Sequence, residues 1–414
     1  MPKSTKKKVT RKRPVDAVVI DPQDKFAEEF NKYWDTKEPD TIYGLYGGSH
    51  HSLGVVSTMY SELPTLDHIL AIKRDSGIFG TPLNKIFEVF GPESSGKTTL
   101  ALYYCVQIIK SGGLAYFVDF EHKFDPAWLI RIASMNGLST EELHKKFRYV
   151  DPKHFEGFME WLLKFMKKVI ASKNEARQKI IELNKKKKKS ADHEEQLEIQ
   201  YKIIEMPFIV VVDSIAGMYT KAEKDKEEET YAQVGELANL FNRVLKHVRY
   251  YIGYTNSLIL FLNQVRDKIE TNQFLARRGS KIKTPGGNAV KHFSDARLQI
   301  ARIGSIKRTR NKIAYTIGTV HNIKTVKNGM GIPPMREVQL KLLNDRGFFS
   351  FHSVLERLVE IGKVKKNGSI YKFAAGGNTI EFHESNTDEV LTENPKYGKL
   401  LHAVYKKYME PTKD

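Results

Sequence analysis

The chain has 414 residues, of which 41% are apolar, enough for two or three domains with sizeable cores. It contains no run of eighteen apolar residues and no apolar stretch behind its basic N-terminus, so neither a membrane partner nor a secretory signal is expected. The excess of 67 basic over 49 acidic residues gives a net charge of +18 and favours a polyanionic partner, most simply nucleic acid. The single cysteine, Cys105, is expected to be a small buried hydrophobe in a cytoplasmic protein.

The N-terminus is a basic tail. Seven Lys or Arg and no acid occur within the first thirteen residues. A DNA-contacting arm, a nuclear targeting signal and a disordered solubilising tail are all consistent with this pattern.

A phosphate-binding motif follows the first strand-like segment. The run Lys85 to Val89 is apolar, Leu100 to Lys110 is helix-like, and the sequence GPESSGKTT between them fits G-x-x-x-x-G-K-[ST]. Glycines allow backbone N–H groups to face phosphate oxygens, and the N-terminus of the next helix adds a positive dipole. The alternative is a Gly-rich surface turn. The expected ATP-binding residues here are Gly91, Pro92, Glu93, Ser94, Ser95, Gly96, Lys97, Thr98 and Thr99.

Two of these residues have specific predicted roles. Lys97 would reach the β and γ phosphates, and Thr98 would supply a hydroxyl to Mg²⁺. ATP and Mg²⁺ are therefore the expected cofactors.

The next strand-like segment ends in acids. Leu114 to Val118 would deliver Asp119 and Glu121 to the carboxyl edge of a sheet. A carboxylate near the γ phosphate could orient the attacking water, whereas the alternative is a solvated strand end.

A helical region lies in the middle of the chain. Phe155 to Ile170 has an apolar stripe at helical spacing, and residues 172–205 are highly charged with sparse apolar residues. We expect an inserted helical hairpin with the lysine run Lys185 to Lys189 at its tip. Such runs are usually solvated, although a DNA contact is the alternative.

Two further strands are predicted at the same sheet edge. Phe208 to Val212 reads as a buried parallel strand and ends at Asp213, a Walker B pattern whose carboxylate would hold Mg²⁺ through water. The strand LILFLNQVR ends in Asn263 and Gln264, whose amides could register the γ phosphate; a solvated strand end is again the alternative.

The segment Val265 to Pro285 is a basic loop. Its aromatic residue could stack on bases, and the two glycines after it permit close approach to phosphate, although a flexible basic surface loop is the alternative. The expected DNA-binding residues are Arg266, Lys268, Phe274, Arg277, Arg278, Lys281, Lys283, Gly286 and Gly287.

Several segments together resemble the RecA recombinase family in order and spacing: GPESSGKTTL, VDFEHKFDP, VVVDSIAGM, LNQVRDKI and PGGNAVKHFSDARLQIARIG. The resemblance implies an α/β RecA-type P-loop ATPase core with a mostly parallel central sheet at 53–349. It also implies an N-terminal helical arm within 1–52, through the helix-like Phe26 to Trp34, and a small α/β C-terminal domain at 350–414. The lysine-rich insertion and the absence of the acidic tail of bacterial RecA fit a phage or divergent homologue.

The resemblance also implies roles for individual residues. Lys97 and Thr98 bind phosphate and Mg²⁺, Glu121 activates water, Asp213 is the Walker B acid, and Gln264 couples the γ phosphate to DNA binding. The adenine would be flanked by Asp125 and Trp128, where Trp replaces the usual Tyr; a core aromatic is the alternative for Trp128.

Residues at the protomer interface are implied as well. Lys291 and Lys327 would reach the neighbour's nucleotide, but the second family lysine falls at Gly329 and the inserting aromatic falls at His292. The first family DNA loop corresponds to the unexpectedly acidic Glu223 to Val234. In the C-terminal domain, a duplex-gathering patch would consist of Lys363, Lys365, Lys366 and Lys372, with a solvated hairpin as the alternative.

The sequence therefore predicts a DNA-dependent ATPase that forms helical filaments on single-stranded DNA and exchanges strands with duplex DNA. Single-strand-binding and mediator proteins are the expected accessory partners. A RecA-fold motor such as a hexameric helicase, or a non-catalytic recombination mediator, remains the alternative.

Overall fold

The computed structural model describes residues 58–70, 80–185, 191–225, 236–267, 282–310, 312–344, 347–349, 351–375 and 378–409. The basic tail and the predicted helix Phe26 to Trp34 lie outside these ranges, as does most of the acidic Glu223 to Val234. Five of the predicted DNA-binding residues also lie outside them: Lys268, Phe274, Arg277, Arg278 and Lys281.

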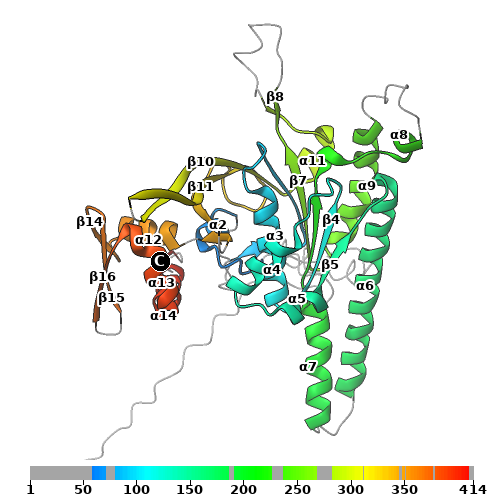
Figure 1. Cartoon of the computed structure of the whole chain (residues 1–414). Helices are drawn as coiled ribbons and strands as arrows, with labels where there is room; N and C mark the ends of the chain where they lie inside the picture. Colours follow the sequence, from blue (N-terminus) through cyan, green and yellow to red (C-terminus); the bar gives the residue numbers. More distant parts are fainter. Residues whose placement is uncertain are drawn as a thin grey trace, which may run out of the picture. The chain divides into compact units, whose positions relative to one another are not determined.

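A nine-stranded sheet forms the centre of the fold (Figure 1). Six neighbouring strands are parallel, and three more extend the sheet in antiparallel fashion beyond β10. This arrangement confirms the predicted α/β class with a mostly parallel sheet. In spatial order the strands are β13 (Gly347–Phe349), β12 (Glu337–Leu343), β11 (Ile313–Asn328), β10 (Ala296–Arg310), β3 (Lys85–Gly91), β7 (Ser257–Gln264), β6 (Phe208–Asp213), β4 (Leu114–Asp119) and β5 (Phe147–Val150).

Helices cover both faces of this sheet. One hydrophobic core contains α2 (Pro64–Leu70), α3 (Lys97–Lys110), α4 (Pro126–Met135) and α5 (Thr140–Lys146). A second core, on the other face, contains α6 (Phe155–Lys185), α9 (Glu236–Ile252) and α11 (Gly287–Phe293). The short strands β1 (Thr58–Met59) and β2 (Thr81–Pro82) pair with each other.

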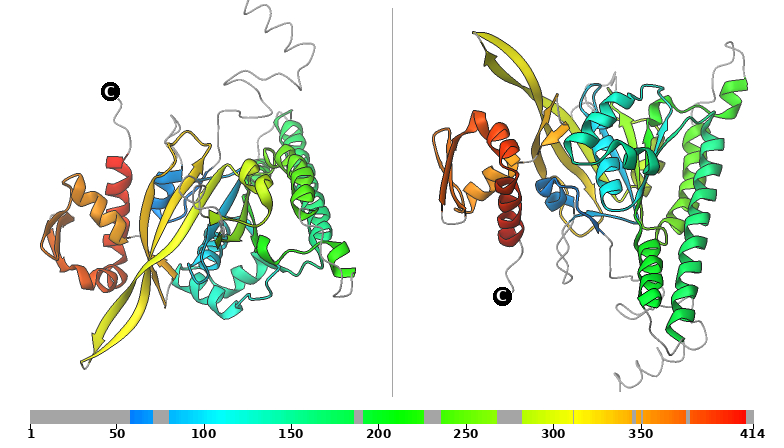
Figure 2. Two further views of the ribbon diagram at one scale, coloured as in Figure 1. Left: turned by 90° about the horizontal axis from the view of Figure 1, so that it is seen from above. Right: turned by 60° about the horizontal axis from the view of Figure 1, so that its bottom comes forward.

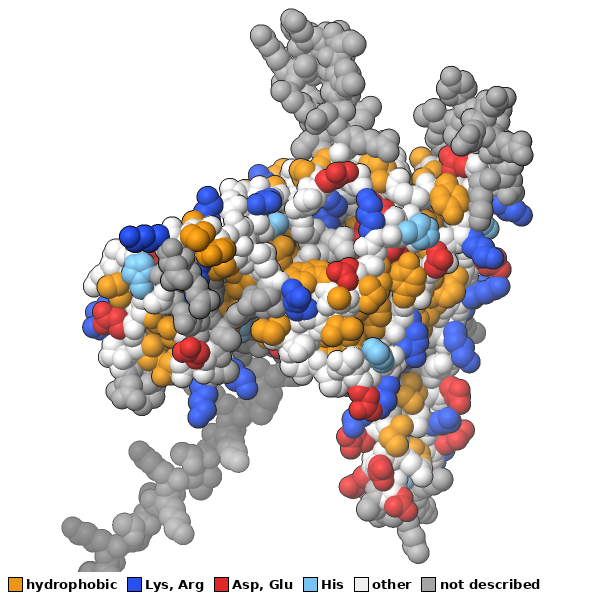
Figure 3. All heavy atoms as spheres, in the orientation of Figure 1, with side chains coloured by type: hydrophobic (Ala, Val, Ile, Leu, Met, Phe, Trp, Pro, Cys, Tyr) orange, Lys and Arg blue, Asp and Glu red, His pale blue; other side chains and the backbone are white. Residues whose placement is uncertain are grey.

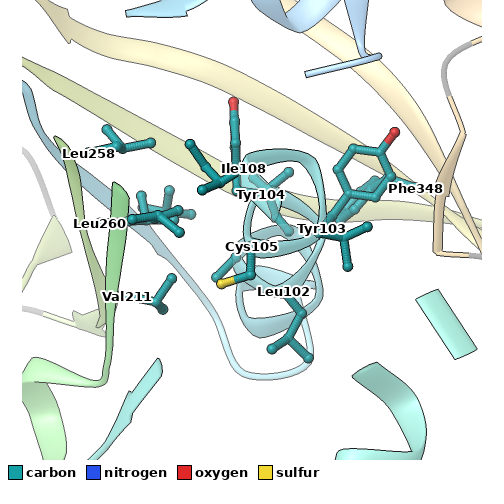
Figure 4. Packing of buried hydrophobic residues seen from close by; sticks show 14 of the residues in the cluster. Leu102, Tyr103, Tyr104, Cys105, Ile108, Val211, Leu258, Leu260 and Phe348 are labelled. Carbon is teal, nitrogen blue, oxygen red and sulfur yellow. The ribbon is translucent and has the colours of Figure 1, made fainter. Parts of the chain in front are cut away.

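The side chains of β6 explain why its sequence is apolar throughout. Val211 belongs to the first core, whereas Val210 and Val212 belong to the second, so alternate residues are buried on opposite faces. Figure 4 shows Cys105 of α3 among the apolar side chains of the first core. Cys105 is a free, fully buried thiol whose pKa is raised by burial, which confirms the expectation of a small buried hydrophobe.

The helices α6 and α7 (Ala191–Glu205) form a long antiparallel pair (Figures 1 and 2). The 31 residues of α6 continue through Ser172 without a break, so the charged segment extends the apolar helix that precedes it. Acidic and basic side chains are interspersed on the surface of the pair (Figure 3).

The strands β10 and β11 form a twisted two-stranded ribbon, drawn in yellow in Figure 2. Only Ala296 to Gln299 of β10 pair with β3, so the distal part of the ribbon extends past that strand. The sequence from Ala296 to Asn328 contains eight Lys or Arg and no Asp or Glu.

The C-terminal part has a hydrophobic core of its own. A three-stranded antiparallel sheet packs with three helices around buried residues such as Tyr371, Leu355 and Leu358. Its elements are α12 (Phe351–Glu360), β14 (Lys365–Asn367), β15 (Ile370–Ala375), β16 (Asn378–His383), η2 (Glu384–Asn386), α13 (Thr387–Glu393) and α14 (Pro395–Met409). Among the helices in the described ranges, none combines the length and apolar character needed to cross a bilayer.

Candidate active site

The strand register brings the predicted polar residues to one edge of the sheet. Gly91 at the end of β3 lies beside Gln264 at the end of β7, and Asp119 at the end of β4 lies beside Asp213 at the end of β6. Open α/β sheets bind ligands at this carboxyl edge.

The phosphate-binding loop connects β3 to α3. Gly96 precedes α3 in the left-handed region with φ of 89°, and a Cβ atom on Gly91 would lie 2.1 Å from the carbonyl oxygen of Ile300. Both positions therefore require glycine. Lys97 Nζ donates to the carbonyl oxygens of Gly91 (3.0 Å) and Pro92 (2.7 Å).

Thr98 and Asp213 are directly bonded, since Thr98 Oγ1 donates to Asp213 Oδ2 over 2.7 Å. Burial raises the pKa of Asp213 to about 6, and the nearby Glu121 and Asp119 carboxylates act in the same direction. The site thus gathers carboxylates beside a hydroxyl at the N-terminus of a helix, which is a set of oxygen ligands suited to Mg²⁺.

Glu121 accepts three hydrogen bonds. Gln264 Nε2 donates to Oε1 over 2.9 Å, Ser214 Oγ also donates to Oε1, and Lys123 Nζ donates to Oε2 over 3.1 Å. Burial by itself raises the pKa of Glu121, but the hydrogen bonds that its carboxylate accepts outweigh burial and lower the pKa overall. Glu121 is therefore a carboxylate at neutral pH, able to accept a proton or orient water.

Asp119 and Asn263 do not act at this edge in the way that the sequence suggests. The Asp119 carboxylate accepts the backbone N–H groups of Glu121 and Phe124, both at 3.0 Å, and so shapes the loop that carries Glu121. The Asn263 side chain is fully buried and bonds to Glu88, so the prediction that it registers the γ phosphate is wrong.

Asp125 and Trp128 both have local structural contacts. Asp125 is the N-cap of α4, accepting from the N–H of Ala127 at 2.9 Å, and Trp128 Nε1 donates to Thr99 Oγ1 at 3.2 Å. The partly buried Trp128 ring packs against the first core. Their role around adenine remains a prediction.

The base of the predicted DNA loop is a two-stranded ladder. β8 (Arg266–Asp267) pairs antiparallel with β9 (Ile282–Lys283), so the two ends of the loop meet directly after Gln264. Gly286 and Gly287 have φ of 83° and 66°, and Cβ atoms there would press on Ile215 in η1 (Ile215–Gly217) and on Ala238. Backbone conformation and packing therefore favour glycine at both positions, whether or not the loop binds DNA.

The acidic segment corresponding to the first family DNA loop begins in α8 (Lys221–Asp225). The Glu223 carboxylate accepts the N–H of Thr220 over 2.6 Å, and Thr220 Oγ1 accepts the N–H of Glu223 over 3.1 Å. Glu223 is thus part of a reciprocal helix cap.

The predicted interface residues cluster at the end of α11. Lys327 Nζ donates to the carbonyl oxygens of Lys291 and His292, both at 2.8 Å, which places a positive charge at the helix C-terminus. Gly329 N donates to the carbonyl oxygen of Asp295 nearby.

Two of the predicted C-terminal DNA lysines form ion pairs within the chain. Lys366 Nζ lies 2.7 Å from Glu356 and 3.3 Å from Glu384, and Lys372 Nζ lies 3.1 Å from Glu381. Much of the positive charge of that patch is therefore neutralised locally.

Two buried polar residues behind the phosphate-binding loop were not predicted from the sequence. Glu88 interrupts the apolar strand β3, His321 lies in the mixed strand β11, and both are at most 1% exposed. His321 Nε2 is bonded to Thr319 Oγ1 at 2.7 Å, and its ring faces Gly96. For Glu88, a charged residue within an apolar strand was the available signal, because such a group needs a buried partner; the polar sequence of β11 gave no such signal for His321.

A parallel α/β sheet with a glycine loop, a threonine and a strand-end aspartate at its carboxyl edge defines a P-loop protein. The chain belongs to the RecA family. The family model described as RecA N-terminal domain matches residues 51–144 and 173–349.

Curated relatives support the same assignment. Protein RecA of Caulobacter vibrioides (strain NA1000 / CB15N) is 31% identical over 331 residues, which cover 80% of this chain and 77% of the relative. Protein RecA of Paracoccus denitrificans is 28% identical over 390 residues, covering 94% and 92% respectively. The crystal structure of the RadB recombinase aligns with a TM-score of 0.41 and 20% identity, covering 70% of this chain and 98% of that one.

Proposed function

We propose that this protein is a DNA-dependent ATPase and recombinase, which assembles as a helical filament on single-stranded DNA and exchanges strands with a homologous duplex. The observation that carries the proposal is the bond between Gln264 and Glu121 at the residue where the basic loop begins. One amide thereby links the candidate catalytic carboxylate to the candidate DNA-binding segment. Membership of the RecA family and the similarity to curated RecA proteins support the same function.

The chemistry follows from the residues at the sheet edge. Backbone N–H groups of the loop and Lys97 would hold the phosphates of ATP, while Thr98 and, through water, Asp213 would hold Mg²⁺. When bound, Mg²⁺ neutralises charge on the phosphate oxygens. The Glu121 carboxylate orients a water molecule and accepts its proton, since the hydrogen bonds from Gln264 and Ser214 keep Oε1 in a fixed position.

DNA recognition would be independent of sequence. The basic loop would contact phosphates and stack Phe274 on bases, while pairing between strands reads the sequence. Lys291 and Lys327 would reach the nucleotide of a neighbouring protomer. For Lys327 this requires exchange of its two bonds at the end of α11.

The first experiment measures ATP hydrolysis with and without single-stranded DNA and images the same samples by negative-stain microscopy. Strong stimulation together with long nucleoprotein filaments is the expected result. Closed rings with duplex unwinding would instead identify a helicase-type motor. DNA binding without turnover would identify a mediator.

Replacement of Lys97 by Ala tests the assignment of the site. We expect Lys97→Ala to abolish turnover and ATP-stabilised DNA binding, because the amine that neutralises phosphate charge is lost. Lys110→Ala, at the other end of α3 and paired with Glu62 at 2.8 Å, is the control and should keep both activities. Normal DNA-stimulated hydrolysis by Lys97→Ala would refute the assignment.

A further inference from the structure

A buried polar network lies directly beneath the phosphate-binding loop. Glu88 of β3 is 0% exposed, and its two carboxylate oxygens have separate partners. Asn263 Nδ2 donates to Oε1 over 2.8 Å, and Arg297 Nε of β10 donates to Oε2 over 2.5 Å. The Arg297 guanidinium also lies over the Phe90 ring, 4.6 Å from its centre.

Asn263 is the branch point of this network. Its Nδ2 donates a second hydrogen bond to the carbonyl oxygen of Pro285 (2.9 Å), and its Oδ1 accepts the backbone N–H of Gln264 (3.0 Å). The amide orientation is fixed by chemistry, since the reverse orientation would place Oδ1 against two acceptors. All the hydrogen-bonding groups of a fully buried amide are thus used, and each leads to a different part of the site.

These contacts hold both ends of the basic loop to one residue. Its first end follows Gln264 in the chain, its last residue Pro285 is bonded to Asn263, and the ends pair with each other between Arg266 and Lys283. Since Gln264 also bonds Glu121, a change in the position of the Gln264 amide is transmitted to a loop whose far end is fixed in the interior.

Packing alone does not account for a buried carboxylate and amide with a partly buried guanidinium at this place. Three apolar side chains would fill the same volume without removing charges from water. The polar groups fix the orientation of the neighbouring backbone, because hydrogen bonds hold the Pro285 carbonyl and the Gln264 N–H in one geometry.

We infer that Asn263, oriented by Glu88 and Arg297, is a positioning residue that couples the nucleotide site to the DNA loop. This inference rests on the proposed function, because it assumes that the loop binds DNA. It concerns residues that touch neither the nucleotide nor the DNA.

The test compares Asn263→Ala with the wild type in two binding measurements. One is the affinity for a fluorescent, non-hydrolysable ATP analogue. The other is the factor by which that analogue tightens binding to a single-stranded oligonucleotide. For the wild type we expect a factor of roughly 5 to 150, the usual range for coupled sites. For Asn263→Ala we expect nucleotide affinity within about threefold of wild type but a coupling factor below about 3.

The control is Asn256→Ala, at the residue directly before β7, at the end of the strand opposite to Asn263. Asn256 Nδ2 also donates to a backbone carbonyl, that of Glu205 at 2.6 Å, and the residue has φ of 59°, so replacement there disturbs the fold without approaching the loop. The coupling factor should remain at the wild-type value in Asn256→Ala. Equal loss in both variants would overturn the inference, because it would show a general effect of destabilisation.

A second variant separates hydrogen bonding from packing. Asn263→Asp keeps the shape and the acceptor for Gln264 N–H but cannot donate to Glu88 and Pro285 together, so it should also lose coupling. Coupling that stays at the wild-type value in Asn263→Asp would overturn the inference.

A readout that does not depend on activity is trypsin cleavage at Arg277 and Arg278. The analogue and DNA together should slow cleavage in the wild type and in Asn256→Ala, but not in Asn263→Ala. If the wild type itself shows no effect of the analogue on DNA binding, the proposed function fails. If the wild type shows coupling and Asn263→Ala retains it, the inference alone fails.

Discussion

Gly96 shows how a single residue fixes the shape of the phosphate-binding loop. It has φ of 89°, and a Cβ atom on it would lie 3.2 Å from Cε1 of the buried His321 ring and 3.4 Å from Phe348. A side chain at this position therefore meets two obstacles, a left-handed backbone and a crowded surface behind the loop.

Gly96→Ala and Gly112→Ala form a matched pair, because Gly112 has φ of 85° but nothing within 4 Å of its Cβ position. Both replacements carry a left-handed penalty of about 1 to 2 kcal/mol. Only Gly96→Ala adds crowding, which costs typically ~1 to 3 kcal/mol. Denaturant unfolding should therefore show the larger loss of stability for Gly96→Ala, together with weaker nucleotide binding.

The double variant Gly96→Ala/His321→Ala should recover part of the nucleotide binding. Equal stability of the two single variants would contradict the crowding argument.

At the scale of single residues, the polar side chains at the strand ends could be predicted from the sequence. The buried polar contacts in the interior of the sheet could be predicted only in part. Asp213 and Gln264 follow from the rule that parallel strands present their carboxyl ends at one edge. Successive side chains in a strand point to opposite faces, so Asn263 and Gln264 could not both face Glu121. The partners of Glu88 were not predictable, since Asn263 and Arg297 lie 175 and 209 positions further along the chain.

One lysine of the highly charged sequence is buried between the helices α6 and α7. Lys173 is 2% exposed, and its Nζ donates to the carbonyl oxygens of Ile204 and Met206 at the end of α7. Burial lowers the pKa of Lys173 to about 8, with Arg177 acting in the same direction and Glu205 opposing. Helical spacing predicted the two helices, but it gave no sign that one lysine among many would be buried.

This shift predicts a pH dependence of stability. Between about pH 8 and 10.5 the unfolded chain keeps a proton that folded Lys173 has lost, so the contribution of Lys173 to the free energy of unfolding rises with pH in that interval. Over the whole interval this contribution changes by on the order of 3 kcal/mol. Below about pH 8 Lys173 is protonated in both the folded and the unfolded chain, so its contribution does not change with pH. Lys173→Met should lack this rise in urea unfolding measured from pH 7.5 to 10.5.

Lys179→Met is the control on the same helix, because Lys179 is about half exposed and pairs with Glu175 at 2.8 Å. It should keep the wild-type rise. A constant difference in unfolding free energy between the wild type and Lys173→Met across this pH range would rule out the buried charge as its source.

Over the whole molecule, the sequence predicted the class of fold better than its charge distribution. The alternation of apolar strands and helices is enough to predict a parallel sheet covered by helices. It does not reveal which lysines are neutralised by acids distant in the chain, as Lys366 is by Glu384. The C-terminal patch and the ribbon of β10 and β11 look similarly basic in sequence, yet in the structure Lys366 and Lys372 of the patch are paired with glutamates.

The salt dependence of DNA binding distinguishes these two kinds of lysine. Each phosphate contact contributes about 0.7 to 0.9 to the slope of log affinity against log salt concentration. Lys307 and Lys312 are exposed on the ribbon, so Lys307→Gln/Lys312→Gln should reduce the slope by up to about 1.4 to 1.8 if both contact phosphate.

The control variant Lys179→Gln/Lys372→Gln removes the same charge from lysines already paired with Glu175 and Glu381, and should change the slope much less. Titration of a fluorescent oligonucleotide from 50 to about 300 mM salt measures both slopes. Equal reductions would mean that net charge, rather than its placement on the ribbon, governs attraction to DNA, because long-range attraction depends only on the total.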